Sequence, residues 1–168
     1  IAILIFAWSL KGMGDALEIG TFVKTIVGTN ASASVILPAI LFLVAIFLSF
    51  STGTSWGTFA ILVPIAIAMF PGADDMQMMI IAVSAVLSGA VCGDHISPIS
   101  DTTVMSSAGA QSNHINHVTT QMQYAAVVAV VSAVGFLLAG FVHVWWIVLG
   151  VSLILLLAVL TVLRKVAK

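Results

Sequence analysis

The chain has 168 residues, of which 61% are hydrophobic and 7% are charged, and its net charge is −1. A soluble domain carries roughly 25% charged residues, so this chain cannot cover a water-facing surface and we expect an integral membrane protein. The near-neutral charge, without a basic stripe, argues against a nucleic-acid partner. The single cysteine, Cys92, excludes an internal disulfide.

The first 30 residues contain no complete span. Residues 1–9 are apolar but shorter than the about 20 residues that a spanning helix needs, and we interpret them as the end of a truncated helix. Residues 11–30 mix glycines with charged residues such as Asp15 and Glu18. They predict a helix end, a connection or a helix that lines a wet interior.

Residues 34–70 are apolar except for an interruption at 51–58, with the sequence Ser-Thr-Gly-Thr-Ser-Trp-Gly-Thr. Two interpretations compete: two spans joined by a short turn, or a re-entrant hairpin whose polar tip lies at membrane depth under a cover of protein or water. We favour the hairpin, because an ordinary surface turn does not need so many hydroxyl groups. Residues 71–75 predict a turn.

Residues 78–109 predict a helix that is broken in the middle. An apolar run ends at Cys92, the polar stretch 93–103 follows with Pro98 inside it, and a short helix of small residues resumes at Val104. An ionisable group at membrane depth costs at least ~2.5–3.5 kcal/mol. The two carboxylates and the histidine of this stretch therefore indicate a function rather than packing.

Two unbroken spans, 124–142 and 145–163, follow a polar segment at 111–123. Basic residues after the last span favour a cytoplasmic C-terminus under the positive-inside rule, which makes the polar segment a cytoplasmic loop. Residues 1–168 then form a single all-α, polytopic transmembrane domain in the cell (inner) membrane.

Interrupted helices are the best sequence indication of a transporter, because unwound carbonyls and helix ends can replace the hydration shell of an ion. Hydroxyl and carbonyl oxygens are hard ligands that suit Na⁺. A carboxylate binds either Na⁺ or a proton, and competition between the two ions is itself a mechanism of antiport. We therefore predict a cation site between the two polar breaks, with Na⁺ and H⁺ as transported ions and no cofactor.

The residues predicted to bind the cation or the proton come from both breaks: Asp94, Asp101, Ser97, Ser100, Thr102, Thr52, Thr54, Ser55 and His95. The Na⁺ ion itself is assigned to Asp94, Asp101 and Thr54. Alternatively, the hydroxyls satisfy the backbone of their own turn, and the carboxylates cap the half-helix that follows. His95 either relays protons or holds Asp94 by a hydrogen bond.

His114 and His117 have a spacing that can bind zinc on one helix face. No third ligand lies nearby in the sequence. We therefore favour a solvated loop for both histidines.

In this order and spacing, residues 6–10, 51–58, 93–103 and 114–121 resemble the NhaC-type Na⁺/H⁺ antiporters. The superfamily of these antiporters also contains sodium–dicarboxylate carriers. The resemblance implies a secondary antiporter that exchanges Na⁺ for H⁺; the alternative is a carrier of the same fold that couples these ions to organic acids such as malate and lactate. It also implies inverted repeats with re-entrant hairpins and broken helices. This chain would be one such half, the C-terminal part of a longer transporter. Its expected partners are Na⁺, H⁺, membrane lipid, the N-terminal half of the same transporter and, in a homodimer, a second copy.

Other classes of protein fit the sequence less well. An intramembrane aspartyl protease needs two carboxylates about 3 Å apart, whereas Asp94 and Asp101 lie on one broken segment, so we expect no enzyme. An organic anion favours arginine or helix N-termini, and the one arginine, Arg164, lies at the membrane exit. A passive channel stays open as an alternative.

Overall fold

The computed structural model describes residues 31–70 and 76–166, together with a few isolated positions before residue 31. Most of residues 1–9 and 11–30, among them Asp15, and the turn predicted at 71–75 lie outside the described residues. The helices are α3 (Ala31–Thr52), α4 (Ser55–Met69), α5 (Met76–Ile96), α6 (Asp101–Gly109), α7 (His114–Phe141) and α8 (Trp145–Val166).

Four of these helices are long and apolar enough to cross a membrane. The candidate spans are Ser34–Thr52, Met76–Ile96, His114–Phe141 and Trp145–Lys165. With 15 residues, α4 is apolar but shorter than a complete span. The prediction of an all-helical, multi-pass membrane protein is thus confirmed in its broad form.

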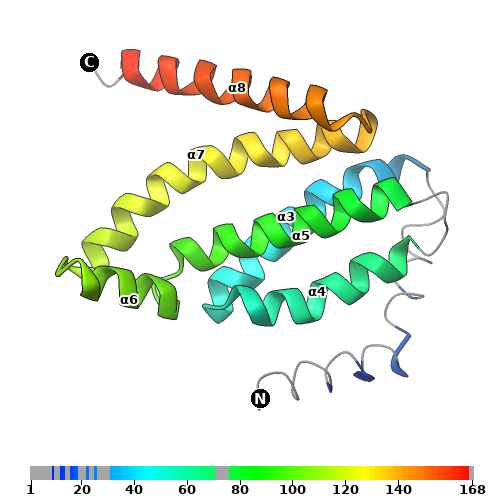
Figure 1. Ribbon diagram of the computed structural model, residues 1–168, viewed down its shortest axis with the longest axis horizontal. Coiled ribbons are helices and arrows are strands. Elements are labelled where there is room, and N and C mark those ends of the chain that lie inside the picture. Colours follow the sequence, from blue (N-terminus) through cyan, green and yellow to red (C-terminus); the bar gives the residue numbers. More distant parts are fainter. Residues whose placement is uncertain are drawn as a thin grey trace.

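The core lies where α3, α4 and α5 pack together (Figure 1). It is made of aliphatic, alanine and aromatic side chains from the three helices: Leu37, Leu41, Ala45, Leu62, Ala66, Met69, Phe70, Ala82, Val86 and Ala90. The hydroxyl of the buried Ser49 on α3 donates a hydrogen bond of 2.6 Å to the Ala90 carbonyl oxygen on α5. Small residues bring the two backbones close enough for this bond, as in other membrane helix pairs.

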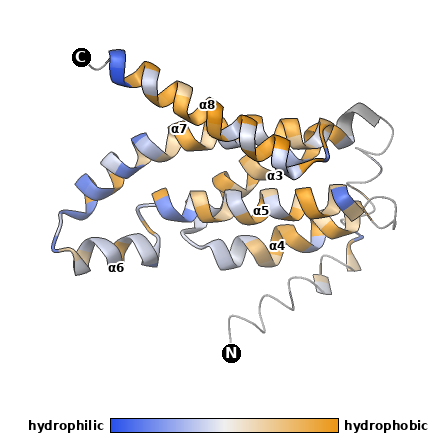
Figure 2. Cartoon of the chain, turned by 45° about the horizontal axis from the view of Figure 1, so that its top comes forward, coloured by the Kyte–Doolittle hydropathy of each residue, from blue (hydrophilic) through white to orange (hydrophobic). Residues whose placement is uncertain are grey.

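The outer faces of the helices are apolar, as expected for contact with lipid. None of the span in α8 is buried within the chain, although α8 has the highest mean hydropathy of the four spans. Figure 2 shows hydrophobic residues along α8 and hydrophilic ones gathered around α6 and the start of α7. On α6, Thr103 and Ser107 are buried whereas Met105 is 64% exposed. The exposed apolar faces of the spans indicate an apolar environment around the protein.

The helix boundaries agree with the predicted breaks but not with the predicted polar loop. The interruption predicted at residues 51–58 is a turn of only two residues, 53–54, between α3 and α4. The broken helix predicted at 78–109 is interrupted at residues 97–100. The prediction of a loop at 111–123 was wrong, because α7 already begins at His114. The Asn113 side chain accepts a hydrogen bond of 3.1 Å from the backbone N–H of Asn116, and this N-cap starts the helix before its apolar part.

Gly93 offers a test of the α3–α5 packing. A Cβ atom at this position would overlap the carbonyl oxygen of Ile46. Gly93→Ala should therefore push the helices apart and lower the free energy of unfolding by about 1–3 kcal/mol, the usual cost of overpacking. The measurement is the midpoint of thermal unfolding of the detergent-purified protein. Gly109→Ala is the control, because its Cβ would meet open space within the described residues, and equal midpoints for both variants would contradict the packing argument.

Candidate functional site

The two polar breaks lie at the same end of the helix bundle. Figure 1 shows the α3–α4 turn, the end of α5 and the start of α6 close together. Gly53, at the turn, has a φ of +67°, and a Cβ atom on it would lie 2.9 Å from the Ile99 carbonyl oxygen. Glycine is thus required here both by its backbone conformation and by the close approach of the second break.

The Asp94 carboxylate is the centre of this region. Asp94 lies in the last turn of α5 and is only 8% exposed. The Ser100 hydroxyl donates to Oδ1 over 2.7 Å, and the hydroxyls of Ser55 and Thr102 donate to Oδ2 over 3.3 and 3.4 Å. Among the described residues, therefore, hydroxyl groups and no lysine or arginine surround this carboxylate.

The three hydroxyl groups belong to the beginnings of two helices. Ser55 is the first residue of α4, Ser100 is the N-cap of α6, and Thr102 lies in the first turn of α6. The positive ends of both helix dipoles therefore face the negative charge of Asp94. The Ser100 and Thr102 oxygens are themselves 2.6 Å apart, so the cluster forms one continuous group of oxygens.

Other hydroxyls hold the backbone around the cluster. The buried Ser97 hydroxyl donates to the Phe50 carbonyl oxygen over 2.7 Å. This carbonyl is one of the last four of α3 and has no partner within the helix. Thr103 contacts the carbonyl oxygens of Asp94 and His95 at 3.4 and 3.3 Å. Thr103 was not among the predicted site residues, although its place three residues after Ser100 puts both on one helix face.

The remaining predicted residues lie outside the Asp94 cluster. Asp101 is exposed, and its Oδ1 accepts from the Thr102 backbone N–H over 2.9 Å. Thr54 is the N-cap of α4 and accepts from the Gly57 N–H over 3.5 Å, and Thr52 donates to the Leu48 carbonyl. The structure thus joins Asp94 to Ser55, Ser100 and Thr102, but not to Thr52, Thr54 or Asp101.

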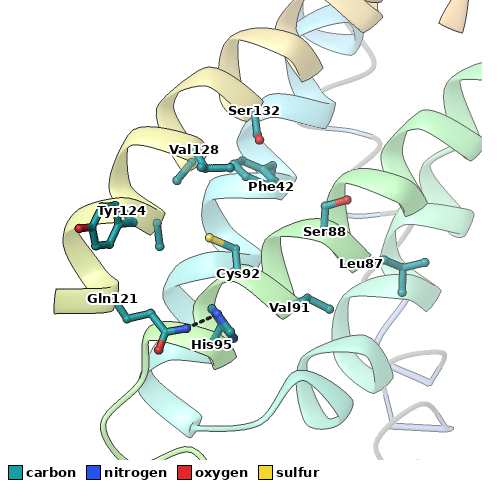
Figure 3. A pocket seen from close by; sticks show the side chains of 12 residues that line it. Phe42, Leu87, Ser88, Val91, Cys92, His95, Gln121, Tyr124, Val128 and Ser132 are labelled. Atoms are coloured by element: carbon teal, nitrogen blue, oxygen red, sulfur yellow. Dashed lines mark hydrogen bonds between the residues drawn. The ribbon is translucent and has the colours of Figure 1, made fainter. Parts of the chain in front are cut away.

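His95 faces away from this cluster. Its Nε2 contacts the Gln121 amide of α7, beside a cavity of about 890 Å³ between α3, α5 and α7 that Cys92 and Tyr124 also line. Figure 3 shows His95 and Gln121 pointing toward one another at one end of this cavity. The hydrogen bonds of the described residues therefore do not join His95 to the Asp94 carboxylate.

The prediction of solvated loop histidines was wrong for His114. This residue opens α7, and both its ring nitrogens lie within hydrogen-bond distance of partners on other segments. Among the described residues, the ring of His117 has a single hydrogen-bond contact, with the exposed Ser106 hydroxyl at 3.5 Å. In the described part of the chain, no three His, Cys, Asp or Glu side chains lie together as a metal site.

These features define a helical membrane protein with a carboxylate and hydroxyl cluster at the junction of three helix ends. The family profile described as "Na+/H+ antiporter family" matches residues 1–141, and the chain belongs to that family. The resemblance to Na⁺/H⁺ antiporters, and with it the assignment to a family of transporters, is thereby confirmed.

Two relatives have been compared with the chain. An uncharacterized protein of Haemophilus influenzae is 48% identical over 143 residues, which are 85% of this chain and 27% of the relative. The malate-2H(+)/Na(+)-lactate antiporter of Bacillus subtilis is 33% identical over 97 residues, which are 57% of this chain and 20% of that protein. The aligned part of the chain is thus about a quarter of the length of these relatives or less, and no solved structure matches it.

A substitution at Ser97 tests whether its hydrogen bond to α3 supports the backbone around the Asp94 cluster. Ser97→Ala removes the donor to the Phe50 carbonyl, and an unsatisfied buried acceptor costs about 1–3 kcal/mol. We expect a lower midpoint of thermal unfolding in detergent. Ser51→Ala is the control, because the exposed Ser51 bonds only within its own helix, to Phe47; a midpoint for Ser97→Ala as high as that of the control would contradict the supporting role.

Proposed function

We propose that the intact protein is a secondary antiporter that exchanges Na⁺ for H⁺ at Asp94. The observation that carries the proposal is a buried carboxylate surrounded by three hydroxyl groups at a helix break. A hydroxyl both donates and accepts hydrogen bonds. The same three groups can therefore donate to the free carboxylate or, after rotation, present their oxygens to a cation beside it.

The exchange follows from competition for one carboxylate. A proton on Asp94 neutralises the charge that Na⁺ needs as its counter-ion, and bound Na⁺ neutralises the charge that would attract the proton. The oxygens of Ser55, Ser100 and Thr102 are hard ligands that suit Na⁺. Asp101, exposed at the start of α6, adds a second negative charge that attracts cations toward the cluster, and we keep it as an outer member of the site.

The geometry favours a cation over an organic anion at this position. Helix N-termini are the usual anion-binding elements in transporters, but here the starts of α4 and α6 already face the Asp94 carboxylate. A second carboxylate would meet that charge without a described cationic side chain to offset it. The Bacillus subtilis relative is nevertheless named as a malate and lactate antiporter, so coupled organic-acid exchange is the second candidate.

The same proposal extends to the arrangement in the membrane. α4 begins at the Asp94 cluster and is too short for a complete span, which supports a re-entrant path for this half of the α3–α4 hairpin, whereas α3 is long enough to span. The basic Arg164 and Lys165 in the last turn of α8 support a cytoplasmic C-terminus in the cell membrane. The length of the relatives supports a longer transporter with a second, inverted half; a homodimer is a further part of the proposal.

Asp94→Asn tests the site most directly. The substitution keeps the size of the side chain and removes its charge, so Na⁺-dependent proton movement should fall to background. The assay is the full-length protein in proteoliposomes with a trapped pH dye and a pulse of Na⁺. If Asp94→Asn exchanges Na⁺ for H⁺ at the wild-type rate, at equal protein content, Asp94 has no part in the mechanism.

Asp101→Asn is the matched comparison, because it makes the same change on an exposed carboxylate seven residues away. Exposed charges contribute roughly 0–1 kcal/mol, so the apparent KM for Na⁺ should rise by no more than about five-fold. A complete loss of exchange in this variant would instead place Asp101 in the inner site.

The second candidate is distinguished in the same vesicles. If the cargo is Na⁺ and H⁺ alone, a Na⁺ pulse changes the internal pH without any organic acid, and adding malate or lactate leaves the initial rate unchanged. A pH change that occurs only in the presence of malate or lactate would favour coupled organic-acid exchange.

A further inference from the structure

His114 links three segments that meet beside the Asp94 cluster. Its Nε2 lies 2.8 Å from the carbonyl oxygen of Pro98, in the break between α5 and α6, and its Nδ1 lies 3.0 Å from the Ser107 hydroxyl on α6. His114 itself is the first residue of α7. One imidazole ring thus connects the break, α6 and α7.

The partners determine the roles of the two nitrogens. A carbonyl oxygen only accepts, so Nε2 carries the hydrogen and donates to Pro98. Nδ1 faces a hydroxyl that can donate to it or accept from it. The Ser107 hydroxyl has one proton, and the Val104 carbonyl oxygen, at 2.9 Å, competes with Nδ1 for it. The ring is held to α6 through this hydroxyl.

The break needs such support because it carries the site. Ser100, two residues after Pro98, donates the shortest hydrogen bond to Asp94, at 2.7 Å. Pro98 has no backbone N–H, which removes one donor that could otherwise hold the segment. Two backbone bonds, from Ser97 to Asp94 and from Ser100 to Ser97, stretch to 3.2 and 3.3 Å. A displacement of Pro98 would therefore move Ser100 relative to the carboxylate.

The other histidines near this end lack such contacts. His117, one turn later on α7, lies 3.5 Å from an exposed serine, and His95 contacts Gln121 beside the cavity (Figure 3). Of these three described histidine rings, only that of His114 contacts the break.

We propose that His114 is a positioning residue of the cation site, which holds the Pro98 carbonyl and thereby sets the place of Ser100 beside Asp94. This inference rests on the proposed function. In this role, His114 does not contact the ion. Its loss should therefore weaken Na⁺ binding more than it slows the exchange of bound ions.

The test compares the dependence of exchange on Na⁺ concentration in the full-length protein in proteoliposomes. Loss of one or two hydrogen bonds corresponds to roughly a three- to ten-fold change in an equilibrium constant, so His114→Ala should raise the apparent KM for Na⁺ by about that factor. The maximal rate per reconstituted molecule should change less. His114→Gln should restore the KM, because its amide offers one donor and one acceptor about as far apart as the two ring nitrogens.

His117→Ala is the control on the same helix and should leave the KM unchanged. An unchanged KM in His114→Ala, or a KM raised equally by His117→Ala, would overturn the proposal, as would a fall in maximal rate alone. Ser107→Ala removes one of the two partners of His114 and is the second variant if His114→Ala is not recovered from the membrane. A wild-type KM for Na⁺ in Ser107→Ala would count against the positioning role of His114.

Asp94→Asn in the same assay separates this inference from the function on which it rests. Full exchange by Asp94→Asn would overturn the cation site itself. Loss of exchange by Asp94→Asn together with a wild-type KM in His114→Ala would overturn the positioning role alone.

Discussion

A single buried carboxylate, Asp94, constrains the arrangement of the helices around it. A charge in an apolar interior needs hydrogen-bond donors, and here they come from the starts of two other helices, α4 and α6. The break at residues 97–100 brings Ser100, at the start of α6, to Oδ1, and the sharp turn at Gly53 brings Ser55 to Oδ2. Close contact of α3 and α5 at Gly93 then places the two breaks side by side.

The hydroxyl groups divide between the carboxylate and the backbone. Those of Ser49, Ser97 and Thr58 donate to carbonyl oxygens of helix backbones. Those of Ser55, Ser100 and Thr102 surround Asp94. The proposed exchange at Asp94 uses only the second set, whose oxygens would turn toward a bound cation, while the first set keeps its bonds to the backbone.

The sequence predicted the helices and both breaks but not which side chains share the site. Apolar runs and Pro98 mark spans and interruptions directly, because both follow from local composition. The polar start of α7 looks like a loop, since its helical state depends on the N-cap at Asn113. Thr54 and Ser55 are adjacent hydroxyl residues, yet only Ser55 reaches Asp94. That distinction and the role of His114 depend on where distant helices pack.

In the exchange proposed above, the charge of the cluster favours coupled movement of the two ions over conduction. With either a proton or Na⁺ bound, Asp94 is electrically neutral, whereas the empty site leaves a buried negative charge beside hydroxyl groups alone. Carrying an uncompensated charge through an apolar interior costs several kcal/mol, so a change of conformation is favoured only when one of the two ions is bound. In the proposed mechanism, a fixed positive partner beside Asp94 would stabilise the empty site and permit it to return without its second ion.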